Sequence, residues 1–218
     1  MLRALVVDGS PEPSSSELVQ KLAAEADYVV AADRGAEVLH AAGVRPQVFC
    51  GDADSVSPEV AAWAHELAAT DIRFPSEKYA TDLALAVDCA RHEAARRGAR
   101  LQLTLTCATG GRPDHQLAVL GLLAEHADAS PRVVEDGVEY WILSPQGASE
   151  WKIEQPEATF SAIALREGTV ISERGSRWEL LEQRMALLGD LGISNVTGAD
   201  GATVTCHEGV VAVFLILH

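Results

Sequence analysis

The chain of 218 residues is 48% hydrophobic and 22% charged, which is typical of a globular protein and excludes collagen-like, coiled-coil and disordered classes. The 32 Asp and Glu residues outnumber the 17 Lys and Arg residues and give a net charge of −15. Because such an acidic surface repels phosphate backbones, we expect no nucleic-acid partner, and handling of a polyphosphate would need metal ions or a local cluster of donors.

The chain carries no signal for a membrane or an oxidising compartment. No apolar stretch approaches the roughly 20 residues that cross a bilayer, and the apolar run near the N-terminus is too short for the core of a signal peptide. The four cysteines form no CxxC pair and no zinc-finger spacing with histidine. We therefore expect reduced thiols, no membrane partner and a cytoplasmic location.

The first part of the chain alternates short apolar runs with Ala-rich helical stretches, which predicts βαβ units around a mostly parallel sheet. Ligands bind beyond the carboxyl ends of the strands in such sheets. The expected strands are 2–8, 27–33, 47–52, 72–75, 101–108 and 131–136. The expected helices are 14–26, 35–43, 58–69, 81–98 and 115–127, with serine caps before the first and third and Gly43 after the second.

From about residue 136 the helical pattern fades, and β-rich segments are separated by glycines. Segment 177–189 is ambiguous and fits an extended conformation as well as a helix. The expected fold class is therefore α/β, with a mostly parallel α/β sandwich domain over 1–135 and an antiparallel β-sandwich domain over 136–218. The expected strands of the second domain lie within 138–144, 158–165, 168–172, 202–209 and 210–217.

Asp52 and Asp54 follow the third expected strand in the sequence GDADS. Residues two apart on an extended segment face the same side, and two close carboxylates repel each other unless a cation or proton lies between them. Oxygen ligands without nearby His or Cys suit Mg²⁺. The alternative is a turn in which the Asp and Ser side chains bond to the local backbone.

Lys78, Thr81 and Asp82 lie in EKYATD, between a strand and the long fourth helix. Thr81 suits the N-cap of that helix and Asp82 its first turn, where the helix dipole favours an anion. Lys78 is the candidate for phosphate binding, because a basic residue at a strand–helix junction can reach an anion there.

Gly110, Gly111, Arg112 and Asp114 lie in TGGRPDH, after the fifth expected strand. Two glycines allow a phosphate to approach the backbone, helix N-terminal amides favour an anion, and Arg112 adds a fork of donors. The sequence is neither a Walker A loop nor a GxGxxG fingerprint. The alternative is a glycine turn with Arg112 and Asp114 paired at the surface.

The three clusters together predict a polyphosphate site at one edge of the sheet, with Mg²⁺ and nucleotide-dependent phosphoryl or pyrophosphoryl transfer. In order and spacing, GDADS, K-x-x-TD and GGRPDH resemble conserved blocks of the thiamine pyrophosphokinase family. The resemblance extends over almost the whole chain through ADRGAEVLHAAGVRP (32–46), GSRWELL (175–181) and GISN (192–195).

The resemblance implies a homodimer in which thiamine binds where the β-sandwich of one subunit meets the α/β domain of the other. It also implies the reaction of ATP with thiamine to give thiamine diphosphate and AMP, with Mg²⁺ as the cofactor. The implied catalytic residues are Asp52, Asp54, Asp82 and Asp114, of which the first three hold the metal. The implied nucleotide-binding residues are Lys78, Thr81, Gly110, Gly111 and Arg112, and the implied thiamine-binding residues are Asp33, Trp178, Ser194 and Asn195.

Five positions differ from the family pattern: Arg34, Gln47, Ala53, Tyr79 and Val119 stand where Gly, an acidic residue, a bulky apolar residue, Asp and Asn are usual. Two alternatives therefore stay open. In the first, ATP is still the donor of the pyrophosphoryl group, but the acceptor is another hydroxymethyl compound such as a pterin. The second is a degenerate family member that binds thiamine or nucleotide without chemistry. The proton acceptor is also open between Asp54, Asp114 and none.

Overall fold

The structure is a computed structural model that describes residues 1–51, 56–67, 70–73 and 80–217. The chain divides into two compact units, Met1–Gln116 and Leu117–His218, which we call unit 1 and unit 2 and describe separately. This division falls earlier than the domain boundary expected after residue 135, which stays a prediction.

Unit 1 contains a sheet of five parallel strands in the order β5-β1-β2-β3-β4. β1, β2 and β3 are short, almost continuous apolar runs, as expected for a parallel sheet with both faces covered, whereas β5 alternates apolar and polar residues and β4 is mostly polar. β1 lies between β5 and β2, so its last residue is flanked by the ends of both strands. The strands are β1 (Leu2–Val7), β2 (Tyr28–Ala32), β3 (Val48–Gly51), β4 (Thr70–Arg73) and β5 (Leu101–Thr106).

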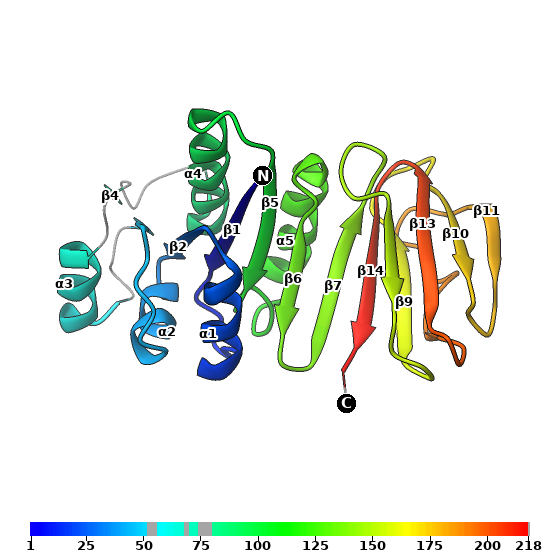
Figure 1. Cartoon of the computed structure of the whole chain (residues 1–218), viewed down its shortest axis with the longest axis horizontal. Coiled ribbons are helices and arrows are strands. Elements are labelled where there is room, and N and C mark those ends of the chain that lie inside the picture. The colour runs from blue at the N-terminus through cyan, green and yellow to red at the C-terminus, as the bar shows by residue number, and fades with distance from the viewer. Residues whose placement is uncertain (52–55, 68–69, 74–79, 218) are drawn as a thin grey trace. The chain divides into compact units, whose positions relative to one another are not determined.

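The helices of unit 1 cover the two faces of this sheet. β1 to β4 step in one direction, whereas the connection from β4 to β5 returns across the sheet. Because crossovers are right-handed, the returning helix α4 covers the face opposite α1, α2 and α3, and Figure 1 shows it apart from them. The helices are α1 (Ser16–Glu25), α2 (Gly35–Ala41), α3 (Pro58–Leu67) and α4 (Asp82–Arg96), and α5 (Pro113–Glu125) spans the boundary between the units.

Unit 2 contains strands from two antiparallel sheets. One has the order β12-β9-β14-β7-β6 and the other β11-β10-β13-β8. The first comprises β6 (Arg132–Glu135), β7 (Val138–Leu143), β9 (Thr159–Ala164), β12 (Asn195–Val196) and β14 (Val211–Ile216). The second comprises β8 (Glu150–Ile153), β10 (Val170–Arg174), β11 (Leu180–Arg184) and β13 (Ala202–Glu208), and a short 3-10 helix covers Ala127–Ala129.

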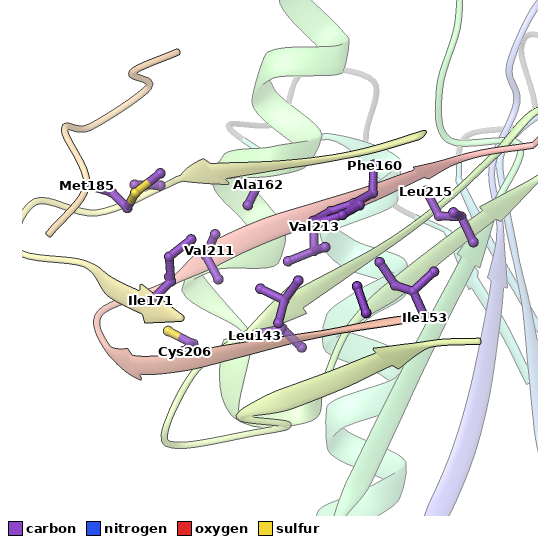
Figure 2. Close-up of a cluster of buried hydrophobic side chains, with 13 residues drawn as sticks. Leu143, Ile153, Phe160, Ala162, Ile171, Met185, Cys206, Val211, Val213 and Leu215 are labelled. Carbon is purple, nitrogen blue, oxygen red and sulfur yellow. The ribbon is translucent and has the colours of Figure 1, made fainter. Parts of the chain in front are cut away.

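The core of unit 2 lies between its two sheets and is built from alternate residues of their strands. Val211, Val213 and Leu215 of β14 point inward, as do Ile171 of β10 and Cys206 of β13 (Figure 2). Period-two alternation is the pattern of a sheet with one buried face, so the expected β-sandwich is confirmed.

Most expected elements are present, including the serine caps: Ser15 caps α1 and Ser57 bonds the amide of Val60 in α3. The ambiguous segment 177–189 contains strand β11. β8 and β12 were not predicted, since β8 is short and mostly polar and β12 has two residues. The four cysteines all lie in the described part of the chain and form no disulfide, and no described helix is both long and apolar enough to span a bilayer.

Candidate active site

The carboxyl ends of β1 and β2 lie close together in unit 1. A Cβ atom added to Gly35, the first residue of α2, would lie 1.9 Å from the carbonyl oxygen of Val7. Only glycine fits this approach, so the start of α2 is held against the end of β1. Asp8, after β1, and Asp33, after β2, are therefore placed at the same edge, which we call the carboxyl edge of unit 1.

Asp8 is the titratable group of this edge that the sequence analysis missed. Burial, with a smaller effect of the Asp33 and Asp82 carboxylates, raises the pKa of Asp8 to about 6, and the Gly9 amide and His115 oppose this shift. These influences show that groups following β1 and β2, and at the starts of α4 and α5, gather around one point. The available signal in the sequence was its position, directly after the first apolar strand.

Asp33, expected to contact substrate, has a left-handed backbone with φ of 45°. Its amide donates to the Cys50 carbonyl at 2.8 Å, and its carbonyl accepts from the Ala36 amide at 3.1 Å. These bonds tie the end of β2 to β3 and to the first turn of α2. Asp33 is thereby fixed at the carboxyl edge, and its expected contact with thiamine stays a prediction.

Gly110 and Gly111 form a turn packed against the chain's own N-terminal loop. Both have positive φ, 94° and 71°, and a Cβ on Gly111 would lie 2.5 Å from Cγ of Pro11. The Ser10 hydroxyl donates to the Thr109 carbonyl. The glycines thus have a steric explanation within the fold, beside the phosphate-binding role expected for them.

Arg112 and Asp114 form an exposed bidentate ion pair, the surface pairing that the sequence analysis left open. Arg112 Nε and Nη2 donate to the two carboxylate oxygens at 3.1 and 2.5 Å. The hydrogen bond with Arg112 lowers the pKa of Asp114 to about 2. A carboxylate with such a pKa is a weak base, so the geometry favours Asp114 as the group that orients Arg112.

Thr81 and Asp82 occupy the capping positions expected of them. The Thr81 hydroxyl accepts from the Ala84 amide at 3.2 Å as the N-cap of α4, and Asp82 is the first helical residue. Asp82 also lies close enough to Asp8 to raise its pKa. The helix start therefore directs Asp82 towards the carboxyl edge.

The remaining expected residues of this site, Asp52, Asp54 and Lys78, lie outside the described residues. Among the residues that the structure describes, no group of three or more His, Cys, Asp or Glu side chains is arranged to hold a metal ion. The expected magnesium site of Asp52, Asp54 and Asp82 therefore stays a prediction.

A cavity of about 220 Å³ lies beside the carboxyl edge, between the N-terminal loop and α2. Ser10, Pro11 and Ser14 line one side, and Arg34 and Glu37 line the other. The N-terminal loop therefore contributes both to the wall of this cavity and to the packing of the glycine turn.

A second cavity, of about 290 Å³, lies within unit 2, and two of the expected thiamine-binding residues line it. Trp178 and Asn195 are lining residues, whereas Ser194 is exposed beside them and its amide donates to the Ser161 hydroxyl at 2.9 Å. The remaining lining residues are Glu173, Leu180, Asp190, Leu191, Gly192 and Ile193.

The Asn195 side chain holds the rim of this cavity together. Its oxygen accepts from the amides of Trp178 at 3.2 Å and Val196 at 2.8 Å. Its nitrogen donates to the Trp178 carbonyl at 2.8 Å and to Glu173 Oε2 at 2.5 Å. Asn195 thus fixes both the Trp178 backbone and a buried carboxylate.

Glu173 is the second functional candidate that the sequence analysis missed. Its side chain is fully buried, and burial raises its pKa to about 7, opposed by the hydrogen bond from Asn195. A glutamate between Ser172 and Arg174 gave no sequence signal, because only the pairing of β10 determines which of these side chains turns inward.

Comparisons with known proteins agree on one family. The model for the catalytic domain of thiamin pyrophosphokinase matches residues 19–134. Thiamine pyrophosphokinase 1 of Oryza sativa subsp. japonica is 23% identical over 172 residues, which are 77% of this chain. The match spans 65% of the length of the rice protein.

Solved structures extend the likeness to both units. A thiamin pyrophosphokinase family protein from Enterococcus faecalis matches with a TM-score of 0.79 and 26% identity, over 99% of each chain. Thiamin pyrophosphokinase from Candida albicans matches with a TM-score of 0.80 and 16% identity, over 99% of this chain and 90% of that one. The expected α/β fold class is confirmed, and because the family model covers more than half of the sequence, the chain belongs to the thiamin pyrophosphokinase family.

Proposed function

We propose that this protein transfers the pyrophosphoryl group of ATP to the hydroxyl of thiamine, giving thiamine diphosphate and AMP. The family supports the reaction. The observation that carries the proposal is the gathering of Asp8, Asp33 and Asp82 at the carboxyl edge, where the buried Asp8 lies close enough for both other carboxylates to act on it. Such a concentration of negative charge is stabilised by a cation, as metal-assisted phosphoryl transfer requires.

We propose Mg²⁺ as the cation, held by Asp52, Asp54 and Asp82. The donor set fits, because carboxylate oxygens suit Mg²⁺, and Asp33 and Asp82 add negative charge beside the buried Asp8. When bound, the ion would offset charge on the phosphate oxygens. Lys78 and Arg112 would bind phosphates, with Asp114 orienting the Arg112 guanidinium.

Thiamine is proposed to bind at the cavity of unit 2, against Trp178, Ser194 and Asn195. Thiamine is a cation with two aromatic rings, and an exposed indole beside acidic groups suits such a ligand. Trp178 is 58% exposed, so its ring is accessible. Asn195 already uses its side-chain donors and acceptor on the protein, so its role is to position Trp178 and Glu173.

We also propose that the protein is a cytoplasmic homodimer. Unit 2 exposes six large apolar side chains within residues 178–193, which we call the apolar patch, and exposed apolar surface is typical of protein–protein interfaces. A second copy of the chain is the proposed partner, and the absence of disulfides among the four cysteines agrees with a reducing compartment. The patch consists of Trp178, Leu181, Leu187, Leu188, Leu191 and Ile193.

The test is a product assay on the purified full chain with Mg²⁺, ATP and thiamine, in which thiamine diphosphate and AMP are expected in equal amounts. Asp82→Asn should lower kcat by at least about 100-fold, because an electrostatic stabiliser of the transition state is lost. Asp88→Asn, at an exposed position of the same helix, is the matched control and should keep normal activity.

Two outcomes would favour the alternatives. AMP release with a hydroxymethyl pterin but not with thiamine would indicate another acceptor. Thiamine or nucleotide binding by calorimetry without turnover would indicate a degenerate binding protein, for which Tyr79, Arg34 and Val119 are the motivating differences.

A further inference from the structure

Glu173 carries a buried oxygen atom that the protein leaves without a hydrogen-bond donor. The side chain lies on β10 between Val204 of β13 and Leu180 of β11, and it is 0% exposed. Oε2 accepts from Asn195, whereas Oε1 has no partner among the described residues. Buried polar atoms are almost always satisfied, and an unsatisfied one is costly. Oε1 therefore points to a donor that comes from outside the chain.

The hydrogen bonds of Asn195 leave no alternative arrangement of this pair. Its oxygen is fixed by the Trp178 and Val196 amides, so its nitrogen must face Glu173 and the Trp178 carbonyl. One carboxylate oxygen of Glu173 therefore accepts its hydrogen bond from Asn195, and the other has no hydrogen-bond donor among the described residues.

Gly192 keeps the space beside Oε1 open. A Cβ atom at residue 192 would lie 3.1 Å from Oε1, and its φ of 91° also disfavours other residues. Glu173 and Gly192 both line the 290 Å³ cavity. Among the described lining residues the charged groups are Glu173 and Asp190, with no basic side chain. The cavity is therefore suited to a donor or a cation.

The walls of the cavity define the shape of its occupant. Trp178, Leu180, Leu191 and Ile193 provide apolar surface, and the volume is at the lower end of the range for small-molecule sites, which suits a single planar ring. A ring that fits must also bring an N–H group to Oε1. The aminopyrimidine of thiamine combines both properties.

We infer that Glu173 is a specificity-determining residue, whose Oε1 accepts a hydrogen bond from the exocyclic amino group of the thiamine pyrimidine. This inference rests on the proposed function. It assigns to β10 a contact that is separate from the expected contacts of Trp178, Ser194 and Asn195.

Glu173→Gln tests this inference, because the substitution should reverse the preference of the protein between an amino and an oxo group on the ligand. Asn195 Nδ2 is a donor and must face the oxygen of the new amide. The Gln nitrogen therefore takes the position of Oε1, where it presents an N–H donor to the amino group of the substrate. Thiamine affinity should fall about 10-fold or more, since a charge-assisted bond becomes a donor–donor contact. An analogue with an oxo group in place of the amino group should bind the variant better than thiamine does.

The measurement is calorimetric titration of full-length protein with thiamine and with the oxo analogue at about pH 8. Glu182→Gln, an exposed glutamine substitution on the adjacent strand β11, is the control and should behave as the unaltered protein. A purely structural role of Glu173 would weaken both ligands equally. An unchanged preference for the amino compound in Glu173→Gln would overturn the inference.

The unaltered protein offers a second measurement that does not depend on folding of the variant. It should bind thiamine about 10-fold or more tightly than the oxo analogue, and equal affinities would also overturn the inference. If the unaltered protein neither binds thiamine nor forms thiamine diphosphate, the proposed function itself fails. If it is active but Glu173→Gln is indistinguishable from it, only the role of Glu173 fails.

Discussion

Three carboxyl groups have pKa values that their surroundings move in opposite directions. Burial raises the pKa of Asp8 to about 6 and that of Glu173 to about 7, whereas Arg112 lowers that of Asp114 to about 2. Groups that titrate near neutral pH release protons when a cation binds beside them. Asp114 stays ionised at neutral pH, which suits a partner for Arg112 better than a proton acceptor.

The raised pKa of Glu173 makes a prediction about stability. The native state holds this proton up to about pH 7, while the unfolded state releases it near the ordinary value of 4.5. The native state therefore binds more protons in this window, and its stability falls as the pH rises. The free energy of unfolding of Glu173→Gln, relative to the unaltered protein, should increase by about 1–3 kcal/mol between about pH 5 and pH 8.

Urea titrations at several pH values measure this difference, with Glu182→Gln as the exposed control. A difference that stays constant across the window would mean that the Glu173 carboxyl titrates at its ordinary pKa.

The role of a residue could be predicted from the sequence where neighbouring residues determine that role. Thr81, Asp82, Arg112 and Asp114 follow from capping rules and from a short charged turn. Glu173 was not predictable, because its burial depends on strand partners that are distant in sequence.

At the scale of elements, the glycine turn 110–111 is shaped by the loop that follows β1. The two segments are far apart in sequence but are joined by the Ser10 hydroxyl and the Thr109 carbonyl. The sequence predicts a phosphate-binding role for these glycines, and the structure adds a steric reason for Gly111, which makes room for Pro11. The turn and the N-terminal loop therefore form one structural unit at the carboxyl edge.

Gly111→Ala should destabilise the protein by about 2 kcal/mol or more, because the new methyl meets Pro11 Cγ and the backbone is left-handed. Gly121→Ala is the matched control in α5, where a Cβ meets no atom within 4 Å. This control should stabilise the protein by about 0.5–1 kcal/mol. Urea unfolding of both variants measures the contrast, and equal stabilities would exclude the close approach of Pro11.

The parallel strands and the main helices were predictable because apolar runs and helical periodicity are properties of contiguous sequence. β8 and β12 were not, because a short polar strand forms only when a neighbouring strand offers backbone partners. The pairing order of β6 to β14 is likewise determined by contacts between distant segments.

At the scale of the whole molecule, a strongly acidic chain exposes an apolar patch on unit 2. Net negative charge opposes self-association, so a dimer would need an interface whose apolar burial exceeds this repulsion. The patch residues from Trp178 to Ile193 provide such a surface on one stretch of chain.

Leu181→Glu should convert the expected dimer into a monomer, because Leu181 is 60% exposed within the patch and a buried unpaired charge is costly. Leu117→Glu changes another exposed leucine, outside the patch, and should leave the dimer intact. Sedimentation velocity measures both. A monomeric unaltered protein, or a Leu181→Glu variant that remains dimeric, would contradict the proposed interface.

The position of β14 between β7 and β9 determines the order in which unit 2 can be completed. Its neighbours are synthesised some 50 to 70 residues earlier, yet neither can pair on that side until residues 211–216 have left the ribosome. The β6–β7 hairpin and the β9–β12 pair would therefore each wait with an open edge, and open edges are sites of aggregation. Chaperone dependence during translation should consequently concentrate on unit 2, and a stop codon placed just before residue 211 should yield insoluble product.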